Sequence, residues 1–308
     1  MKSRTKWRRP VFIVIFCVFA AVFVFSAVML IRSVMEFVKE NKEHMALEDE
    51  FLIYDTSHIQ TSGTAPDTAP EVTEATTGKH HAIVPGWATN SSGVLTETEA
   101  ETGGTAEPPL NTEPPAENKP LWPEFSVNWE ILSARNPDVI GWIWMYDSDI
   151  SYPVLLGDSN DEYLYSTIDG AYARFGSIFA DYRVNGDFTS RNTIIYGHNG
   201  GYGVKFGGLM NFRSQSYYEG HRYICILTPS GLMKYSIYSA YVTTTSGAAY
   251  QISFDSDAAF ESFLKETAAA SEIVTGVVPG TSNRILTLST CTNAAEDERM
   301  VIHAVLEN

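Results

Sequence analysis

Hydrophobic residues follow different patterns in successive parts of the 308-residue chain. Residues 11–31 are 21 consecutive residues with no charge and almost no polarity. A helix rises about 1.5 Å per residue, so a helical run of this length crosses a bilayer core of about 30 Å. Residues 56–120 have no apolar period and are rich in Thr, Pro, Glu, Gly and Ala, with too little apolar side chain to offset the entropy cost of ordering. The pattern predicts a transmembrane helix and then a disordered stalk.

Charges in front of the apolar run predict its direction in the membrane. Five basic residues and no acidic residue precede it: Lys2, Arg4, Lys6, Arg8 and Arg9. By the positive-inside rule, the N-terminus stays in the cytoplasm and the chain after the run lies outside. A cleaved signal peptide is the alternative, but its apolar region is usually only about 7–15 residues long. The exit at Phe25-Ser26-Ala27 is also a poor cleavage site. We therefore expect an uncleaved, single-pass anchor in the cell membrane.

These patterns divide the chain into four parts. We expect a cytoplasmic basic tip at residues 1–10, the anchor at 11–31, a largely disordered extracellular stalk at 32–120, and a folded domain at 121–308. The first part of the stalk mixes charged and apolar residues, which favours a continuing helix that frays near Tyr54.

Short segments rich in Val, Ile, Tyr and Thr, separated by turn residues, dominate the folded domain. We expect eight strands, at residues 139–146, 150–156, 177–180, 192–196, 222–228, 233–245, 284–289 and 299–306. Helices are fewer, and we expect them at 126–135 with Ser126 as the N-cap, 161–165, 206–212 and 255–272. The last has apolar residues at three- and four-residue spacing, namely Phe260, Phe263, Leu264 and Ala268. Many short strands and few helices predict a mainly β (α+β) fold built on a closed, mixed barrel.

Charge and motif spacing exclude several classes of function. The net charges of residues 1–40, 41–120 and 121–308 are +5, −11 and −10, which sum to −16. The acidic body has no cluster of Lys and Arg with interleaved aromatic residues, so we expect no nucleic-acid partner. His80-His81 has no further ligands nearby, and the acidic residues from 147 to 161 lack the spacing of a calcium loop. The glycine-rich segment 200–208 lacks the Gly-Lys-Ser/Thr ending of a phosphate-binding loop. We expect no metal and no cofactor.

Cysteine use points to one reactive thiol. Cys17 lies in the apolar run, and Cys225 lies in an apolar strand where a free cysteine behaves as a small hydrophobe. A disulfide between Cys225 and Cys291 is the alternative, although a domain that depends on disulfides usually has more cysteines. Cys291 follows a predicted strand, which favours a free thiol that takes part in chemistry.

Two more functional groups occupy predicted strand ends. His198 follows the strand 192–196, and Arg299 begins the strand 299–306. A thiolate attacks carbonyls, a charged imidazole stabilises it and then protonates a departing amine, and a guanidinium that keeps its proton binds the developing oxyanion. Each residue alone has an ordinary alternative: a buried inert cysteine, a turn histidine, a solvated arginine. Together, Cys291, His198 and Arg299 predict a catalytic site for acyl transfer through a thiol.

Residues 136–308 resemble the class B sortases, a family of cysteine transpeptidases of Gram-positive bacteria. The resemblance rests on the nucleophile strand Thr287-Leu288-Ser289-Thr290-Cys291, on Tyr196-Gly197-His198, on the strand from Arg299 to Ala304, on the opening segment from Asn136 to Ile143, on Ile150–Val154, on Gly176–Asp181, and on the helix at 255–272. The resemblance implies an eight-stranded sortase barrel and substrate-binding roles for Ser289, Asn160 and Tyr250. Thr292 departs from the pattern, because some class B members carry an acid there.

The resemblance also implies a reaction and its partners. We expect a membrane-anchored transpeptidase that cleaves the C-terminal sorting signal of secreted proteins through a thioacyl intermediate and transfers them to an amine of a peptidoglycan precursor or cross-bridge. Two alternatives stay open. One is a sortase that polymerises pilins through a pilin lysine, and the other is a non-catalytic surface module that binds peptides.

Overall fold

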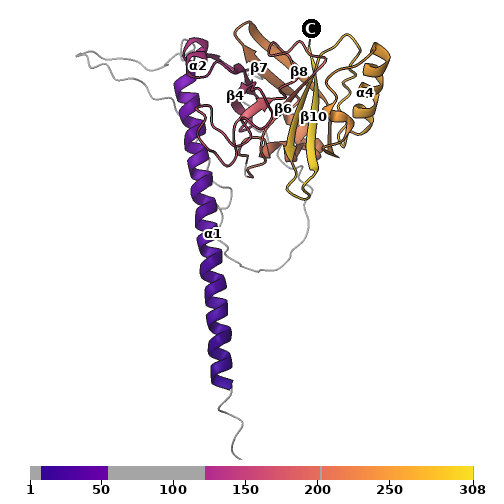
Figure 1. Cartoon of the computed structure of the whole chain (residues 1–308). Coiled ribbons are helices and arrows are strands. Elements are labelled where there is room, and N and C mark those ends of the chain that lie inside the picture. Colours follow the sequence, from indigo (N-terminus) through magenta and orange to yellow (C-terminus); the bar gives the residue numbers. More distant parts are fainter. Residues whose placement is uncertain (1–7, 55–121, 202, 308) are drawn as a thin grey trace, which may run out of the picture. The chain divides into compact units, whose positions relative to one another are not determined.

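The computed structural model describes residues 8–54, 122–201 and 203–307 (Figure 1). The disordered stalk expected at 56–120 lies outside these residues. The described helix α1 and the barrel fall in one compact unit of the chain.

Eight strands close into a barrel in the order β10-β8-β7-β3-β4-β5-β6-β9. The strands are β3 (Val139–Trp144), β4 (Ser151–Leu155), β5 (Ile178–Ala180), β6 (Asn192–Tyr196), β7 (Tyr223–Thr228), β8 (Gly231–Thr244), β9 (Ile285–Cys291) and β10 (Glu298–Leu306). Neighbouring strands are antiparallel except for the parallel pairs β4–β5 and β6–β9. The predicted fold class, a closed mixed barrel with few helices, is confirmed.

Branched apolar side chains from alternate strand positions fill the barrel. Ile143, Val154, Ile195, Leu288 and Ile302 are each fully buried in one cluster. Full burial of such a side chain contributes about 1.5–3 kcal/mol, so a core of this kind holds the strand ends in fixed positions. The catalytic groups expected at those ends are therefore carried by a rigid scaffold.

Helices are few and short in the folded domain, and η2 (Gly207–Arg213) adds Leu209 and Phe212 to the core cluster of the barrel. The longest in the folded domain is α4 (Asp257–Ala269), which is capped by the Ser256 hydroxyl and buries Phe260, Phe263 and Leu264 as expected. Thr267, and not the expected Ala268, completes its buried face. The remaining short helices are α2 (Trp129–Arg135), η2 (Gly207–Arg213), α3 (Gln215–Gly220) and η3 (Ala248–Tyr250).

Two of the local predictions were wrong. Asn128, not Ser126, caps α2 by accepting a hydrogen bond from the backbone N–H of Ile131. Ser126 lies in β2 (Phe125–Val127), which pairs with β1 (Leu52–Tyr54), so a distant strand determines its conformation. The helix expected at 161–165 is a series of turns.

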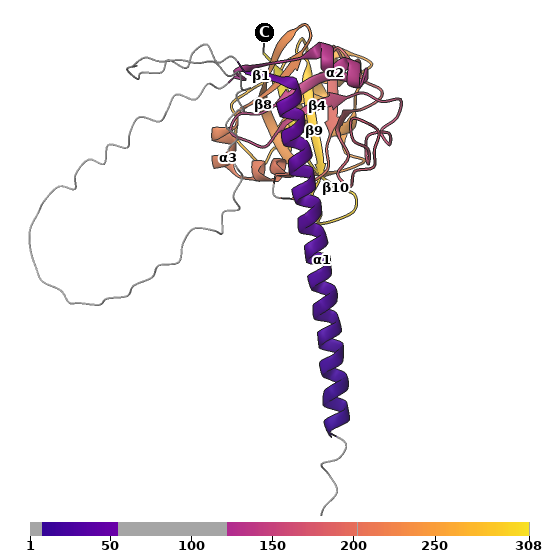
Figure 2. The ribbon, with the colours of Figure 1, turned by 90° about the vertical axis from the view of Figure 1, so that its left-hand side faces the viewer.

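Helix α1 (Arg8–Phe51) includes the apolar run and continues 20 residues beyond Ile31, directly into β1 (Figure 2). Among the described residues it is the one helix that is long and apolar enough to cross a membrane. Its last turns do not fray, because they pack on the folded domain. The His44 ring stacks on Tyr152 at 4.3 Å, its Nε2 lies 2.8 Å from the carbonyl oxygen of Ser151, and Phe51 is fully buried. Residues 32–54, expected as part of the stalk, are thus helix and strand attached to the barrel unit.

Candidate active site

Three neighbouring strands bring the predicted catalytic residues to the same end of the barrel. In the parallel pair β6–β9, Tyr196 lies opposite Ser289, and the backbone N–H of Gly197 donates to the carbonyl of Ser289 at 3.2 Å. His198 and Cys291 each lie two residues further along, so they reach the same level. In the antiparallel pair β9–β10, Cys291 lies directly opposite Arg299. The register therefore places the thiol strand between the histidine strand and the arginine strand.

The Cys291 thiol is free and partly exposed. Cys225 is also free, is buried, and lies on β7 opposite Trp144 and Lys234, so the disulfide between the two cysteines is not formed. Burial raises the pKa of the Cys225 thiol to about 12, which keeps it protonated and inert at neutral pH. Of these two thiols, Cys291 is the one available for chemistry.

Two asparagines fix the chain around Cys291. The side-chain amide of Asn199 donates to the carbonyl oxygen of Cys291 at 2.9 Å, and that of Asn293 donates to the carbonyl oxygen of Asn199 at 3.2 Å. These bonds join the loops that follow His198 and Cys291. Neither asparagine was expected from the sequence, where the only signal is the position of Asn199 immediately after His198.

The His198 ring is oriented by its own contacts. Nε2 lies 2.8 Å from the carbonyl oxygen of Leu164, and the ring packs against Tyr165 at 5.2 Å and Phe175 at 6.4 Å. Because a carbonyl only accepts, Nε2 carries the proton, and Nδ1 has the lone pair in the neutral ring. Among the described residues Nδ1 has no hydrogen-bond partner, so it is the ring nitrogen whose lone pair is available to accept a proton.

Burial lowers the pKa of His198, the Leu164 bond opposes this, and the positive charges of Lys205 and Arg299 lower the pKa further. The imidazole is therefore mostly neutral at pH 7. In this form it can act as a base toward Cys291, and the imidazolium that results readily gives its proton to a leaving group.

The Arg299 guanidinium is held at one nitrogen. Its Nη1 donates to the carbonyl oxygens of Glu296 at 2.8 Å and Glu298 at 3.0 Å. Arginine has five N–H donors, so donors remain for a substrate oxygen. Its charge affects the pKa values of both His198 and Tyr250, which agrees with its position beside them.

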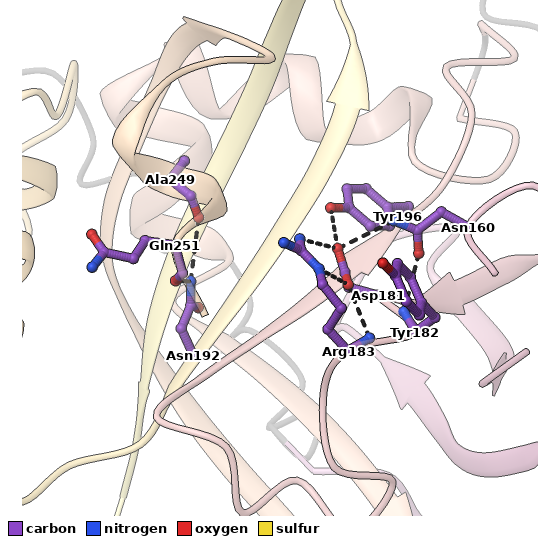
Figure 3. A network of polar contacts seen from close by, with 8 residues as sticks. All are labelled: Asn160, Asp181, Tyr182, Arg183, Asn192, Tyr196, Ala249 and Gln251. Carbon is purple, nitrogen blue, oxygen red and sulfur yellow. Dashed lines mark hydrogen bonds and ion pairs between the residues drawn. The ribbon is translucent and has the colours of Figure 1, made fainter. Parts of the chain in front are cut away.

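Two of the predicted substrate-binding residues contact each other. The hydroxyls of Tyr250, in η3, and Ser289, in β9, lie 2.9 Å apart. Buried Asn192 holds η3 in place by donating to the carbonyl oxygens of Ala249 at 3.2 Å and Gln251 at 2.9 Å (Figure 3). Sequence reasoning missed Asn192, because a polar residue within an apolar strand gives no sign of its distant partners.

The third, Asn160, joins this surface through Asp181. Its amide nitrogen donates to Asp181 at 3.2 Å, and the same carboxylate oxygen accepts from the Tyr196 hydroxyl at 2.9 Å (Figure 3). The Tyr196 ring stacks on that of Tyr250, with centroids 6.4 Å apart and an interplanar angle of 15°. All the residues selected from the sequence therefore belong to one connected region around the ends of β6, β9 and β10.

Several known proteins are similar to this region in both sequence and fold. The family model of the sortase domain matches residues 147–307. Sortase B of Staphylococcus aureus is 36% identical over 178 residues, which are 57% of this chain and 73% of that protein. The structure of a Staphylococcus aureus sortase B–substrate complex is 36% identical and covers 58% of this chain and 84% of its own, with a TM-score of 0.56.

A structure of sortase B complexed with triglycine is 34% identical and covers 58% of this chain and 85% of its own, with a TM-score of 0.55. A thiol, an imidazole and a guanidinium on adjacent strand ends are the groups that acyl transfer through a cysteine requires. Together with these matches, they place the chain in the sortase family, as a class B cysteine transpeptidase.

Proposed function

We propose that this sortase cleaves the sorting signal near the C-terminus of secreted proteins and transfers the shortened protein to an amine of the cell wall, either in a peptidoglycan precursor or in a cross-bridge. The observation that supports the proposal most strongly is the strand register, which sets Cys291 opposite Arg299 and level with His198. The thiol, the imidazole and the guanidinium of this site are the groups needed for two successive acyl transfers.

In the first transfer, Nδ1 of His198 takes the proton of the Cys291 thiol, and the thiolate attacks the scissile carbonyl carbon. Free N–H groups of Arg299 bind the oxyanion that forms. The tetrahedral intermediate collapses, the C–N bond breaks, and the departing amine takes the proton from the imidazolium. A thioester to Cys291 remains.

In the second transfer, an amine of the acceptor attacks the thioester carbon and gives its proton to His198. The new C–N bond forms, the C–S bond breaks, and the thiolate recovers the proton from the imidazolium. The lowered pKa of His198 suits both steps, because the ring begins neutral and its protonated form is a ready acid. A sortase B has been described in complex with triglycine, a peptide with a terminal amine.

We assign peptide-binding roles to Ser289, Tyr250 and Asn160. Ser289 lies on the strand that delivers the nucleophile, two residues before Cys291, and its hydroxyl pairs with that of Tyr250 in η3. A hydroxyl can both donate and accept a hydrogen bond. The Ser289 and Tyr250 hydroxyls can therefore bind the backbone of an extended peptide on either side of the scissile bond.

We assign the outer face of the cell membrane as the location. Residues 11–31 anchor the chain, the basic tip at 1–10 stays in the cytoplasm, and the barrel lies outside. A substrate that is itself held by a membrane-embedded tail meets the barrel at a raised effective concentration, because both are confined to one plane.

Peptide cleavage by the full-length protein in detergent micelles tests the proposal. We expect cleavage of at least one member of a fluorogenic sorting-signal library, transfer to added triglycine, and complete loss of both in Cys291→Ala. Arg299→Lys is the matched variant, which keeps the charge but loses the forked donors and should lower kcat by about 100-fold. Binding of peptides without cleavage under all conditions favours the non-catalytic module instead. Transfer to a pilin lysine in preference to triglycine favours the pilin polymerase.

A further inference from the structure

Asp181 is a fully buried carboxylate that neither acyl transfer uses. It follows β5 and is surrounded by donors (Figure 3). The Arg183 guanidinium donates through Nε to Oδ1 at 2.8 Å and through Nη2 to Oδ2 at 2.7 Å, and the backbone N–H of Arg183 donates to Oδ1 at 3.1 Å. Tyr196 and Asn160 donate to Oδ2. Burial alone raises the pKa of this carboxyl, but the hydrogen bonds outweigh it and the pKa is lowered, so Asp181 is ionised.

This arrangement determines the orientation of the Asn160 amide. Its nitrogen donates to Asp181, and its oxygen accepts from the backbone N–H of Tyr182 at 3.0 Å. The opposite orientation sets an oxygen against a carboxylate and an NH2 group against an N–H, and both contacts are repulsive. With one amide N–H bonded to Asp181, one N–H of the partly exposed Asn160 is left to donate.

Asp181 also links Asn160 to a second group of residues in the proposed peptide site, Tyr196, Tyr250 and Ser289. Its Oδ2 holds the Tyr196 hydroxyl, and the Tyr196 ring stacks on Tyr250, which pairs with Ser289. The buried carboxylate of Asp181 therefore orients the Asn160 amide and also supports the stacked rings of Tyr196 and Tyr250.

We infer that Asp181 is a positioning residue for the peptide substrate: it fixes the amide of Asn160 so that the remaining N–H donates to a backbone carbonyl of an extended sorting peptide. This inference rests on the proposed function. A backbone carbonyl is the ligand that suits a single fixed N–H donor, so this contact recognises the extended peptide chain in preference to a particular side chain.

The test measures peptide affinity separately from catalysis. The full-length Cys291→Ala protein in detergent micelles is titrated with the tightest-binding member of a fluorescein-labelled sorting-pentapeptide library, and anisotropy gives Kd. Asp181→Asn and Asn160→Ala should each weaken binding by about tenfold, as expected for loss of one hydrogen bond to the peptide. The double variant should lose less than the product of the two single losses, because both changes remove the contact made through Asn160.

Thr267→Val is the matched control. Like Asp181→Asn, it changes a buried polar group: it removes a hydroxyl that bonds Tyr238 at 2.9 Å and the carbonyl of Phe263 at 2.9 Å, outside the network around Asp181. We expect its Kd to stay within about twofold of the parent.

A measurement on the parent protein requires no change at Asp181. With 15N-labelled asparagine, peptide saturation should shift the side-chain amide signal of Asn160, identified by its loss in Asn160→Ala. An unshifted signal overturns the inference, as does an unchanged Kd in Asp181→Asn, or a double variant whose loss is the product of the two single losses. If the peptide binds as described but the Cys291 protein cleaves nothing, the proposed reaction fails while the positioning role stands. A library with no binding member overturns both.

Discussion

His303 gives the most quantitative prediction. It lies in β10 and is fully buried. Its Nδ1 lies 2.8 Å from the hydroxyl of Thr287, and its Nε2 lies 3.1 Å from the hydroxyl of Tyr241. Thr287 uses its single proton in a 2.6 Å bond to the side-chain carbonyl oxygen of Asn192, so Nδ1 of His303 must donate and Nε2 must accept. The contacts therefore specify a neutral ring.

Burial lowers the pKa of His303 from the usual 6.5 to about 3. Between pH 6.5 and 3 the His303 imidazole is protonated in the unfolded chain but not in the folded chain. The free energy of unfolding therefore falls as the pH falls through that window. One pKa unit corresponds to about 1.4 kcal/mol, which gives at most about 5 kcal/mol over the whole window and about 3 kcal/mol between about pH 6.5 and 4. Either amount is a large fraction of a typical folding stability of about 5–15 kcal/mol.

Urea unfolding of the full-length protein in detergent, followed by tryptophan fluorescence from about pH 4 to 7, measures this effect. Between about pH 6.5 and 4 the free energy of unfolding of the wild type should fall by about 3 kcal/mol more than that of His303→Gln, which has no imidazole to protonate. Thr287→Val is the control: it costs stability at every pH but keeps the imidazole and therefore the steep pH dependence. Equal pH dependence in wild type and His303→Gln, or an NMR titration of His303 above about pH 5, would show that the folded protein does not hold this ring neutral.

Three further predictions concern the site. Lys205→Met should raise the pKa of His198, because a positive charge that disfavours the imidazolium is removed, and an NMR titration that shows no rise or a fall contradicts this. Asn192→Ala should raise KM for peptide cleavage and lower the free energy of unfolding by about 1–3 kcal/mol, because the two carbonyls that hold η3 lose their donor; unchanged KM in cleavage assays and unchanged urea unfolding contradict it. Iodoacetamide at mildly alkaline pH should label Cys291 and leave the buried thiol of Cys225 unmodified until the protein unfolds, and mass spectrometry that finds equal labelling in the native state argues against the assigned burial.

The sequence predicts the barrel well because its signal is local. Runs of Val, Ile, Tyr and Thr between turn residues determine where a strand can form, and each of the eight expected strands is present. Predictions from local sequence are wrong where a segment distant in the chain determines the conformation. Ser126 has the right side chain for a helix cap, but pairing with Leu52–Tyr54 draws it into a strand. The end of α1 is helical and ordered because of contacts with the barrel, which its own composition does not reveal.

The same distinction separates the site residues that were expected from those that were missed. Cys291, His198 and Arg299 stand at strand ends within recognisable motifs. Asp181 and Asn192 each contact a partner that is distant in sequence: Asn160 is 21 residues from Asp181, and Gln251 is 59 residues from Asn192. Hydrogen-bond networks of this kind appear only when the strand register is known, and so the roles of these two residues follow from the structure alone.

In the proposed reaction, Cys291 forms a covalent acyl bond with a sorting peptide. Intact-mass and peptide-mapping mass spectrometry of the full-length protein, quenched during turnover with a sorting-signal library and no added amine, tests it directly. We expect a mass increase equal to the acyl part of the cleaved peptide, located on Cys291, removed by hydroxylamine and absent in Cys291→Ala. Cleavage that proceeds without an adduct on this cysteine, or an adduct that persists in Cys291→Ala, would show that Cys291 is not the acyl carrier.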